Sequence, residues 1–514
     1  MRPAAVPQQE RGIAARDLRW LLGGIVDAPA IDITGISTDS RSIGPGNVFL
    51  AVKGIANHGI TFVDRAVEAG AVAILWDSAT APDPGARGAA AMIAVRGLAD
   101  RLGELANRWF DAPSDRMSVS GITGTNGKTT VAFLVAQCMQ LLRTPCAYMG
   151  TLGAGIATPE RETGLTTPGC IELHRNLADF AERGVAHAAL EVSSHALHQH
   201  RIDGIRFDSV LFTNLSRDHI DYHGDMDAYG ETKARFIMDG DVANRIVMVD
   251  SPFGLRLANR CMDRSADNLI AVSSQSASDA AAMTHVHLQA IETDELGSTV
   301  AARSSWGNAQ FHLPLAGSFN VANAALVLAQ LLAWRIPLSD AANALSRALP
   351  PPGRMQRVLF DAAAPVPAVY IDYAHTPAGL EAVLTTIRSH CKGNLWCVFG
   401  CGGDRDRGKR GPMGRIVARL ADRAIVTSDN PRSENPSDII AEVLRHMPGG
   451  TVAIEDRAVA IAHAVSLAES DDVVLIAGKG HENYQVIGDT RRPFSDYDVA
   501  LSNLEKREPG SRPQ

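Results

Sequence analysis

The feature that most constrains the fold is a glycine-rich loop between an apolar run and a helical pattern. Residues 118–123 read Ser-Val-Ser-Gly-Ile-Thr, and residues 124–130 read Gly-Thr-Asn-Gly-Lys-Thr-Thr. The residues that follow predict a helix from about Gly127 to Leu142. A strand, a glycine loop and a helix in this order are typical of a phosphate-binding loop in an α/β domain with a parallel sheet.

The residue types in this loop suit phosphate chemistry. Glycines let successive backbone N–H groups approach phosphate oxygens, and a helix N-terminus adds positive potential. We expect Lys128 to reach the β- and γ-phosphates and the Thr129 hydroxyl to bind Mg²⁺. In the strict spacing a glycine would stand where the sequence has Ile122, so Gly121 and Gly124 mark a variant loop. The alternative, a glycine-rich turn with a surface lysine, leaves the flanking strand and helix unexplained.

Chain length and two changes of pattern predict three domains. The 514 residues, 46% hydrophobic and 21% charged, suit a globular chain with roughly 100–200 residues per domain. The pattern of apolar runs changes near residue 98 and again at the Pro-Pro-Pro-Gly turn 350–353. We therefore expect a small N-terminal α/β domain at 1–98, a central nucleotide-binding domain at 99–349 and a C-terminal domain at 350–514.

Strands and helices alternate in all three segments. In the first, strands over 47–52 and 72–75 accompany a helix over 62–69, and in the second, strands end at Glu191 and Thr213. In the third, four apolar strands each end in a polar or glycine-rich loop, which predicts a doubly wound, Rossmann-like parallel sheet with ligands beyond its carboxyl ends. Those strands are expected at 368–372, 395–399, 424–427 and 473–476.

Charge and cysteine content exclude several classes of protein. Lys+Arg 49 against Asp+Glu 57 gives −8 with no long run of either sign, so no nucleic-acid partner is expected. Seven scattered cysteines without a Cys-x-x-Cys pair argue against a disulfide framework or a structural zinc site. No apolar stretch has signal-peptide character or reaches the roughly 18 residues that span a bilayer. We expect a soluble, cytoplasmic protein that is not inserted in a membrane.

Several longer motifs carry a resemblance to a known family. They are the loop 124–130, Glu-Val-Ser-Ser-His-Ala-Leu-His-Gln-His-Arg at 191–201, Phe-Thr-Asn-Leu-Ser-Arg-Asp-His-Ile-Asp-Tyr-His-Gly at 212–224 and Asp-Asn-Pro-Arg at 429–432. From the Thr-Asp-Ser-Arg turn 38–41 to Gly-Lys-Gly-His-Glu at 478–482, the chain resembles the Mur ligases. Within that family it is most similar to the MurE type, the UDP-N-acetylmuramoyl-L-alanyl-D-glutamate:meso-diaminopimelate ligases.

The resemblance implies an ATP-dependent acid–amino-acid ligase of cytoplasmic peptidoglycan precursor synthesis. Its carboxylate substrate takes the γ-phosphoryl group of ATP to give an acyl phosphate, the amine of meso-diaminopimelate attacks, and ADP and phosphate are released. Such chemistry needs neutralised charge, aligned substrates and exclusion of water. The implied cofactor is Mg²⁺, with ATP as co-substrate, small-molecule partners only, and a monomeric protein.

By the same resemblance, four residues form the catalytic and metal centre. Lys128, Glu191, His219 and Lys233 are the catalytic set, and Thr129 joins the last three as metal contacts. Lys233 would be carbamylated by CO₂, which needs a neutral amine and hence a site that depresses its pKa. On composition alone, Lys233 is a solvated helix lysine and His219 an ordinary loop histidine.

The resemblance also implies contacts to the two nucleotide substrates. ATP contacts are expected at Gly124, Thr125, Asn126, Gly127, Lys128, Thr129, Thr130, Asn320 and Arg354. Contacts to the UDP-sugar-peptide are expected at Thr38 and Ser40, with segment 55–57 nearby, and at Thr166, Thr167, Ser193, Gln199 and Arg201. A guanidinium such as that of Arg201 suits a phosphate or carboxylate, whereas a hydroxyl in a turn often caps backbone N–H groups instead.

The most specific expectation concerns the identity of the amine substrate. Diaminopimelate differs from lysine by a distal carboxylate, which must lose water on binding and needs a strong partner such as Arg432. The tetrad around Arg432 could also be a simple Asn-Pro turn. Its place at a strand end favours a pocket, and the resemblance implies diaminopimelate contacts at Arg405, Asp429, Asn430, Pro431, Arg432, Gly478 and Glu482. The sequence departs from the family pattern at Leu165 and Gln356, where Asn and Glu are usual.

Two alternatives stay open at this point. One is another amide ligase of the same fold, such as a folylpolyglutamate synthase or a different Mur ligase, against which the Asp-Asn-Pro-Arg tetrad and the Asp39-Ser40-Arg41 turn argue. The other is a nucleotide-dependent switch or binding protein, although the sequence has no Asn-Lys-x-Asp guanine-reading motif. ADP release that requires both a sugar-peptide and an amine distinguishes a ligase from a switch.

Overall fold

The computed structural model describes residues 14–54, 57–264, 268–275, 284–294, 297–360 and 366–507. Contacts divide the chain into two compact units: residues up to Val119 with Thr163–Ala188 and His195–Phe207, and Ser120–Glu162 with Ala189–Ser194 and all residues from Asp208. Ile55 and Ala56, in the segment expected near the uridine, lie outside the described residues. The three predicted domain boundaries stay predictions.

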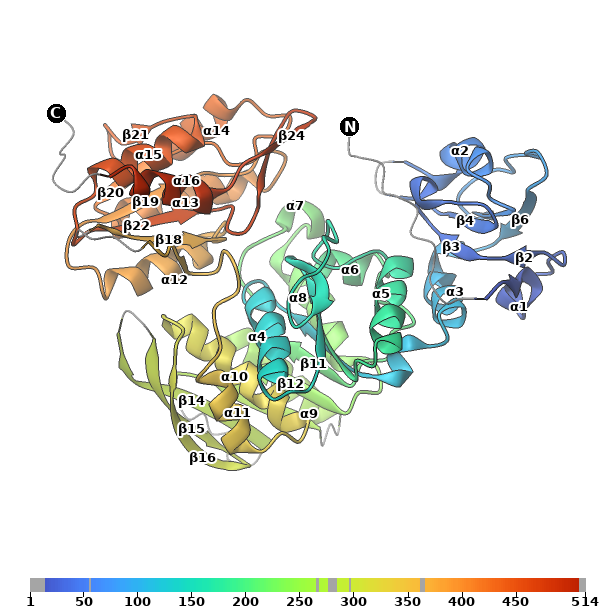
Figure 1. Ribbon diagram of the computed structural model, residues 1–514, viewed down its shortest axis with the longest axis horizontal. Coiled ribbons are helices and arrows are strands. Elements are labelled where there is room, and N and C mark those ends of the chain that lie inside the picture. Colours follow the sequence, from blue (N-terminus) through green and yellow to red (C-terminus); the bar gives the residue numbers. More distant parts are fainter. Residues whose placement is uncertain are drawn as a thin grey trace. The chain divides into compact units, whose positions relative to one another are not determined.

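The first unit is built on a four-stranded parallel sheet of order β3-β4-β5-β6 (Figure 1, blue). Its strands are β3 Gly35–Ser37, β4 Asn47–Ala51, β5 Ala73–Asp77 and β6 Ala91–Val95, and its helices include α1 Leu18–Leu22, α2 Val63–Glu68, α3 Leu102–Trp109 and α5 Cys170–Glu182. Phe49, Ile74 and Trp76 pack with α2, while Val48, Leu50 and Leu75 pack with α1, α3 and α5. The predicted strands and helix of this segment are confirmed within two residues.

The second unit contains a ten-stranded sheet of order β16-β15-β14-β13-β12-β11-β7-β10-β8-β9, two strands of which begin in residues of the first unit. The strands are β7 Ser118–Thr123, β8 Cys146–Gly150, β9 Gly153–Ile156, β10 His187–Glu191, β11 Ser209–Phe212, β12 Asn244–Met248, β13 Leu269–Ser273, β14 Thr284–Thr293, β15 Ser298–Ser304 and β16 Gly307–Leu313. Pairing is parallel from β7 through β11, β12 and β13 to β14, and antiparallel in β14-β15-β16 and β8-β9. The strand β7 is therefore central, and the loop that follows it lies between two neighbouring strand ends.

Two apolar helices form the core against this sheet. They are α4 Lys128–Leu141, predicted from the sequence, and α10 Ser318–Ala333, and they share one buried cluster with α11 Leu338–Leu345 and the strands. Helices α8 Met226–Met238 and α9 Pro252–Asp263 contact β11, β12 and β13. The short helices α6 Ser194–His198 and α7 Ile220–His223 follow β10 and β11.

The C-terminal part of the second unit is a six-stranded sheet of order β17-β18-β22-β19-β20-β21, parallel except for β17 (Figure 1, orange to red). Its elements are β17 Gln356–Arg357, β18 Ala368–Asp372, α12 Pro377–Arg388, β19 Leu395–Phe399, α13 Arg410–Leu420, β20 Arg423–Val426, α14 Pro436–Leu444, β21 Val452–Ala453, α15 Arg457–Leu467, β22 Val473–Ala477, the hairpin β23 Tyr484–Ile487 with β24 Thr490–Pro493, and α16 Asp496–Glu505. Alternate strand residues pack against α12, α13 and α14 on one face and α15 and α16 on the other. The predicted doubly wound sheet and its four strands are confirmed.

All seven cysteines are free thiols in the structure. Within the described ranges, no helix is both long and apolar enough to cross a bilayer.

Candidate active site

The glycine loop after β7 has a backbone that only glycine fits. Gly124 has φ +147° and Gly127 has φ +86°, both in the region that side chains disfavour. A Cβ on Gly124 would overlap Thr213 Oγ1, and a Cβ on Gly127 would overlap Asn323 Oδ1. The helix α4 begins at Lys128, directly after the loop, so its free N–H groups face the same space.

The segment after β11 holds this loop in place. Thr125 N–H donates to the Asn214 carbonyl at 2.9 Å and Asn126 N–H donates to Asn214 Oδ1 at 3.0 Å. Thr213 Oγ1 donates to the Asn126 carbonyl at 2.6 Å. Sequence reasoning did not assign a role to Thr213 or Asn214, although a polar pair at the end of a buried parallel strand is a signal for one.

The Lys128 ammonium lies over the loop carbonyls. Its Nζ donates to the carbonyls of Gly124 and Thr125 at 2.9 and 2.8 Å. Desolvation lowers the pKa of Lys128, and the carboxylates of Glu191 and Asp218 oppose this shift. Lys128 is therefore held against the backbone of the loop, and its contact with the β- and γ-phosphates stays a prediction.

Glu191 ends β10 as a fully buried carboxylate that accepts hydrogen bonds from Thr129, Tyr148 and Thr151. Thr129 Oγ1 and Thr151 Oγ1 donate to its Oε2 at 2.9 and 3.0 Å, and Tyr148 Oη and Thr151 N–H donate to its Oε1 at 2.7 and 2.9 Å. Burial, followed by the charge of Glu191, raises the pKa of Tyr148 well above its ordinary value. Two predicted metal contacts, Thr129 and Glu191, are thus brought together, and their oxygen donors are those that Mg²⁺ prefers.

Lys233 reaches the same loop from α8. Its side chain is 1% exposed, its Nζ donates to the Gly124 carbonyl at 2.9 Å, and it lies 4.6 Å from the centre of the Tyr229 ring. Burial, with the neighbouring charge of Lys128, lowers the pKa of Lys233 well below its usual range despite the opposing charge of Asp218. The reading of Lys233 as a solvated lysine, which composition alone suggests, is therefore wrong.

His219 sits at the edge of this cluster. Its backbone is left-handed at φ 54°, its side chain is 38% exposed, and its Nε2 lies 3.5 Å from Asp218 Oδ2. Among the residues that the structure describes, no three His, Cys, Asp or Glu side chains are arranged to hold a metal ion. The predicted metal set contains only two such side chains, His219 and Glu191, so their joint role stays a prediction.

Of the two remaining residues expected near ATP, Arg354 contacts the loop directly. Arg354 Nη2 donates to Thr129 Oγ1 at 3.1 Å, and its guanidinium stacks 4.1 Å from the Tyr373 ring centre. Arg354 Nη1 is buried and has no hydrogen-bond partner within the described residues, so a donor is available to an anion. Asn320 is buried and its Oδ1 accepts from Asn323 Nδ2 at 3.3 Å.

Three of the residues expected to bind the UDP-sugar-peptide contact one another in the first unit. Arg201 Nη1 donates to the Thr167 carbonyl at 2.9 Å and Arg201 Nε donates to Gln199 Oε1 at 3.1 Å. Thr166 lies next to this group along the chain. Their role towards a substrate stays a prediction.

The other expected contacts of this substrate are Thr38, Ser40 and Ser193. Thr38 is exposed, and Ser40 is buried at the start of the 3₁₀ turn Ser40–Ser42, which Asp39 caps. Ser193 belongs to the second unit.

The loops at the carboxyl ends of the C-terminal strands meet around Asn430. Asn430 Nδ2 donates to Glu482 Oε2 at 2.9 Å, and the fully buried Lys479 Nζ donates to the same oxygen at 2.9 Å and to Asn430 Oδ1 at 3.2 Å. A Cβ on Gly478, at φ +119°, would lie only 2.6 Å from Asp429 Oδ2. The structure thus brings four expected residues together and adds Lys479, a buried cation that the sequence reasoning did not single out.

Arg432 is held beside this group in a strained backbone conformation. Its φ is +52°, its N–H donates to the Val486 carbonyl of β23 at 3.1 Å, and its Nη1 donates to the Gly403 carbonyl at 2.7 Å. Burial, followed by the charge of Arg405, lowers the pKa of Arg432. Arg405 is exposed and donates to the Asp404 carbonyl at 3.1 Å.

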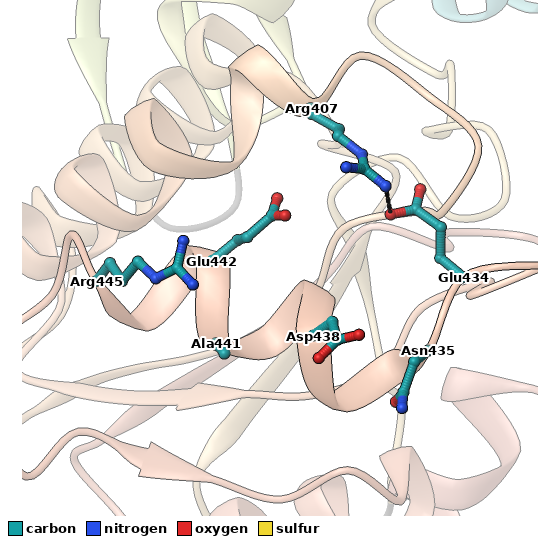
Figure 2. Close-up of a pocket in the computed structure, with 7 residues that line it drawn as sticks. All are labelled: Arg407, Glu434, Asn435, Asp438, Ala441, Glu442 and Arg445. Atoms are coloured by element: carbon teal, nitrogen blue, oxygen red, sulfur yellow. Dashed lines mark hydrogen bonds and ion pairs between the residues drawn. The ribbon is translucent and has the colours of Figure 1, made fainter.

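A polar pocket of about 310 Å³ opens behind these loops (Figure 2). Its lining consists of Arg407, Glu434, Asn435, Asp438, Ala441, Glu442 and Arg445. None of these residues belongs to the predicted site.

Comparison with known families decides the class of protein. The Mur ligase family catalytic domain matches residues 32–110, the Mur ligase middle domain 122–331 and the Mur ligase glutamate ligase domain 353–480. The chain belongs to the Mur ligase family. A relative from Xylella fastidiosa (strain 9a5c) is 44% identical over 488 residues, covering 94% of this chain and 96% of its own. One from Alkalilimnicola ehrlichii is 40% identical over 499 residues, covering 95% and 98%.

Both Mur ligase relatives are named UDP-N-acetylmuramoyl-L-alanyl-D-glutamate–2,6-diaminopimelate ligase. A solved structure of that name is 30% identical, with a TM-score of 0.65 over 96% of this chain and 99% of the other. A folylpolyglutamate synthase from Mycobacterium tuberculosis, complexed with ADP and AMPPCP, is 19% identical with a TM-score of 0.61 over 80% of this chain and 96% of its own, and shows only the shared fold. The predicted α/β fold with N-terminal, middle and C-terminal Mur ligase domains is therefore confirmed, as is the ligase class over a nucleotide switch.

Proposed function

We propose that this Mur ligase adds meso-diaminopimelate to UDP-N-acetylmuramoyl-L-alanyl-D-glutamate at the expense of ATP. The observation that carries the proposal is the loop cluster around Asn430, where Arg432, Glu482 and Lys479 supply both signs of charge at the carboxyl ends of a parallel sheet. A site with both signs of charge suits an amino acid with charges at both ends. The names of the relatives supply the two substrates.

Three parts of the chain divide the work. We assign the UDP end of the sugar-peptide to residues 1–98, ATP to 99–349 and the amine to 350–514. Thr38 and Ser40 would contact uridine. The rest of that substrate would contact Thr166, Thr167, Ser193, Gln199 and Arg201.

The phosphoryl step depends on fixed positive groups. Backbone N–H groups of 124–130, the Lys128 ammonium and the free Arg354 Nη1 can neutralise charge on the transferring phosphoryl group. The substrate carboxylate attacks the γ-phosphorus and ADP leaves. The amine then attacks the acyl carbon, loses a proton, and phosphate leaves.

Mg²⁺ would be held by Thr129 and Glu191, with His219 and carbamylated Lys233 as further contacts, and would supply charge neutralisation. The burial of Lys233 supports the carbamate, because a neutral amine is the form that reacts with CO₂. The carbamate is an anion among cationic groups, where it would help place the metal.

Arg405 and Arg432 would bind the acid groups of diaminopimelate. Asn430, Glu482 and Gly478 would face its distal amino-acid end, with Asp429 and Pro431 shaping the turn. L-lysine lacks the second carboxylate and would leave the half-buried Arg432 guanidinium without an anion, which disfavours lysine strongly.

Omission experiments test the reaction class. ADP release from ATP should require both UDP-N-acetylmuramoyl-L-alanyl-D-glutamate and meso-diaminopimelate, because the acyl phosphate forms only on the first and turns over only with the second. ADP release that is equally fast without the sugar-peptide would contradict a ligase mechanism.

A further inference from the structure

The loop that carries Arg405 and the loop that carries Arg432 are tied to each other by reciprocal hydrogen bonds. Gly403 N–H donates to the Asn430 carbonyl at 3.0 Å, and Arg432 Nη1 donates to the Gly403 carbonyl at 2.7 Å. Ser433 donates to the Asp404 carboxylate through its N–H at 3.1 Å and its Oγ at 2.7 Å. These hydrogen bonds therefore hold the two loops together, although about thirty residues separate them along the chain.

Glu434 accepts hydrogen bonds that hold these two loops in place. Its Oε1 accepts from the N–H of Asp404 at 2.6 Å, and Asp404 is the residue directly before Arg405. Its two oxygens also accept from Arg410 Nη2 at 2.8 and 3.0 Å, and Oε2 accepts from Arg407 Nη2 at 2.8 Å. Glu434 itself stands two residues after Arg432, so one carboxylate fixes the backbone of both loops.

A buried guanidinium anchors Glu434 to the helices behind. Arg410, the first residue of α13, is 2% exposed and lies between Glu434 and Glu442 of α14, to which its Nη1 donates at 2.7 Å. Glu434 is 14% exposed and Glu442 31%. Figure 2 shows Glu434 paired with Arg407 at one side of the pocket and Glu442 projecting from the helix towards the same space.

This anchoring opposes two unfavourable features of the loops, a strained backbone and a repulsion between two arginines. Asp404 at φ 53° and Arg432 at φ 52° are both non-glycine residues with left-handed backbones. The charges of Arg405 and Arg432 also repel each other. A ligand with two carboxylates would relieve that repulsion, but the protein must hold the guanidinium groups in position beforehand.

We propose that Glu434 is a positioning residue that sets the placement of Arg405 relative to Arg432, and thereby the preference for an amine with a second carboxylate. This positioning role rests on the proposed function, since the two arginines are assigned there to the acid groups of the amine. Glu434 acts through the loops and touches no substrate.

Glu442 provides a matched control. It pairs with the same buried Arg410 but has no hydrogen bond to either arginine-bearing loop among the contacts described. Glu434→Ala and Glu442→Ala each leave Arg410 one carboxylate short, so both should lower the melting temperature, Glu434→Ala by more because it also loses the bonds to Arg407 and Asp404. Only Glu434→Ala also releases Asp404.

The test measures KM and kcat for meso-diaminopimelate, L-lysine and ATP by ADP release in the unmodified chain and both variants. Glu434→Ala should raise the KM for diaminopimelate about tenfold or more and lower the ratio of kcat/KM for diaminopimelate to kcat/KM for lysine by a similar factor. The KM for ATP should stay within about twofold of the parent value. Glu442→Ala should keep the diaminopimelate KM of the parent. Glu434→Gln, which keeps an acceptor for Asp404 N–H, should raise that KM less than Glu434→Ala.

An unchanged diaminopimelate KM in Glu434→Ala, or an equal rise in Glu434→Ala and Glu442→Ala, would overturn the positioning role while the ligase activity stands. If Glu434→Ala does not fold, the same criterion applies to Glu434→Gln against Glu442→Gln. An unmodified chain that releases no ADP with diaminopimelate would instead remove the proposed function, and the positioning role with it.

Discussion

Lys233 illustrates how burial turns an ordinary side chain into a candidate reactive group. Its ammonium is fully enclosed, contacts the Gly124 carbonyl and lies near Lys128, so the charged form is disfavoured and its pKa is lowered. A group of this kind binds its proton more strongly in the unfolded chain. Raising the pH from the folded pKa towards the ordinary lysine value therefore stabilises the fold and increases the fraction of neutral amine.

Replacement of Lys233 tests the carbamate. Lys233→Ala should lower kcat by about a hundredfold or more, because an anion that helps place Mg²⁺ is lost, while ATP affinity is kept. A short carboxylate such as acetate in the buffer should restore part of the activity. The exposed Lys392→Ala serves as control. Full turnover of the Lys233 variant in a steady-state assay would refute the assignment.

Replacement of Arg432 tests the proposed amine site. Arg432→Ala should lower kcat/KM for meso-diaminopimelate by at least about a hundredfold, since a buried carboxylate loses its partner, and should hardly change the KM for ATP. Arg423→Ala, at the opposite end of β20 and exposed, is the control. Equal losses for both substrates would point to a folding defect rather than a lost contact.

Residues were predictable where a local motif carries the chemistry. Lys128 and Thr129 follow from backbone geometry that the glycine loop alone prescribes. Tyr148, Asn214 and Lys479 were missed because their roles arise from contacts to distant parts of the chain, which no local pattern encodes. Lys233 was assigned only through the resemblance.

Strands and helices were predictable where burial leaves a pattern. The strands β18, β19, β20 and β22 are short apolar runs ended by polar loops, as expected of a parallel sheet covered on both faces. The hairpin β23-β24 was not predicted, because its residues are half-buried or exposed and show no apolar run. Yet that hairpin holds the backbone of Arg432.

The loops around Glu434 should respond to acid. A hydrogen bond from Arg410 is the main cause that lowers the pKa of Glu434 below its ordinary 4.5. Its stabilising effect is therefore complete above about pH 4.5 and is lost as the pH falls through the folded pKa. Thermal unfolding should show Glu434→Gln less stable than the parent by roughly 1–3 kcal/mol at neutral pH, with the gap narrowing below about pH 4.5. A gap that widens in acid would contradict this sign.

For the whole molecule, alternating strands and helices predicted the α/β class, and the family comparison establishes the three Mur ligase domains. The fold alone does not choose a substrate, since a folylpolyglutamate synthase shares it. The choice depends on the charged loops at the ends of the C-terminal strands. Their tetrad Asp-Asn-Pro-Arg is visible in the sequence, while the bonds that position it are not.

The most direct test is therefore an ADP-release assay of the unmodified chain with ATP, UDP-N-acetylmuramoyl-L-alanyl-D-glutamate and either meso-diaminopimelate or L-lysine. Because lysine would leave an arginine without its anion, kcat/KM for diaminopimelate should exceed kcat/KM for lysine by about a hundredfold or more, up to roughly 10⁴-fold. Comparable turnover with lysine would contradict the assignment of Arg405 and Arg432 to the acid groups of the amine.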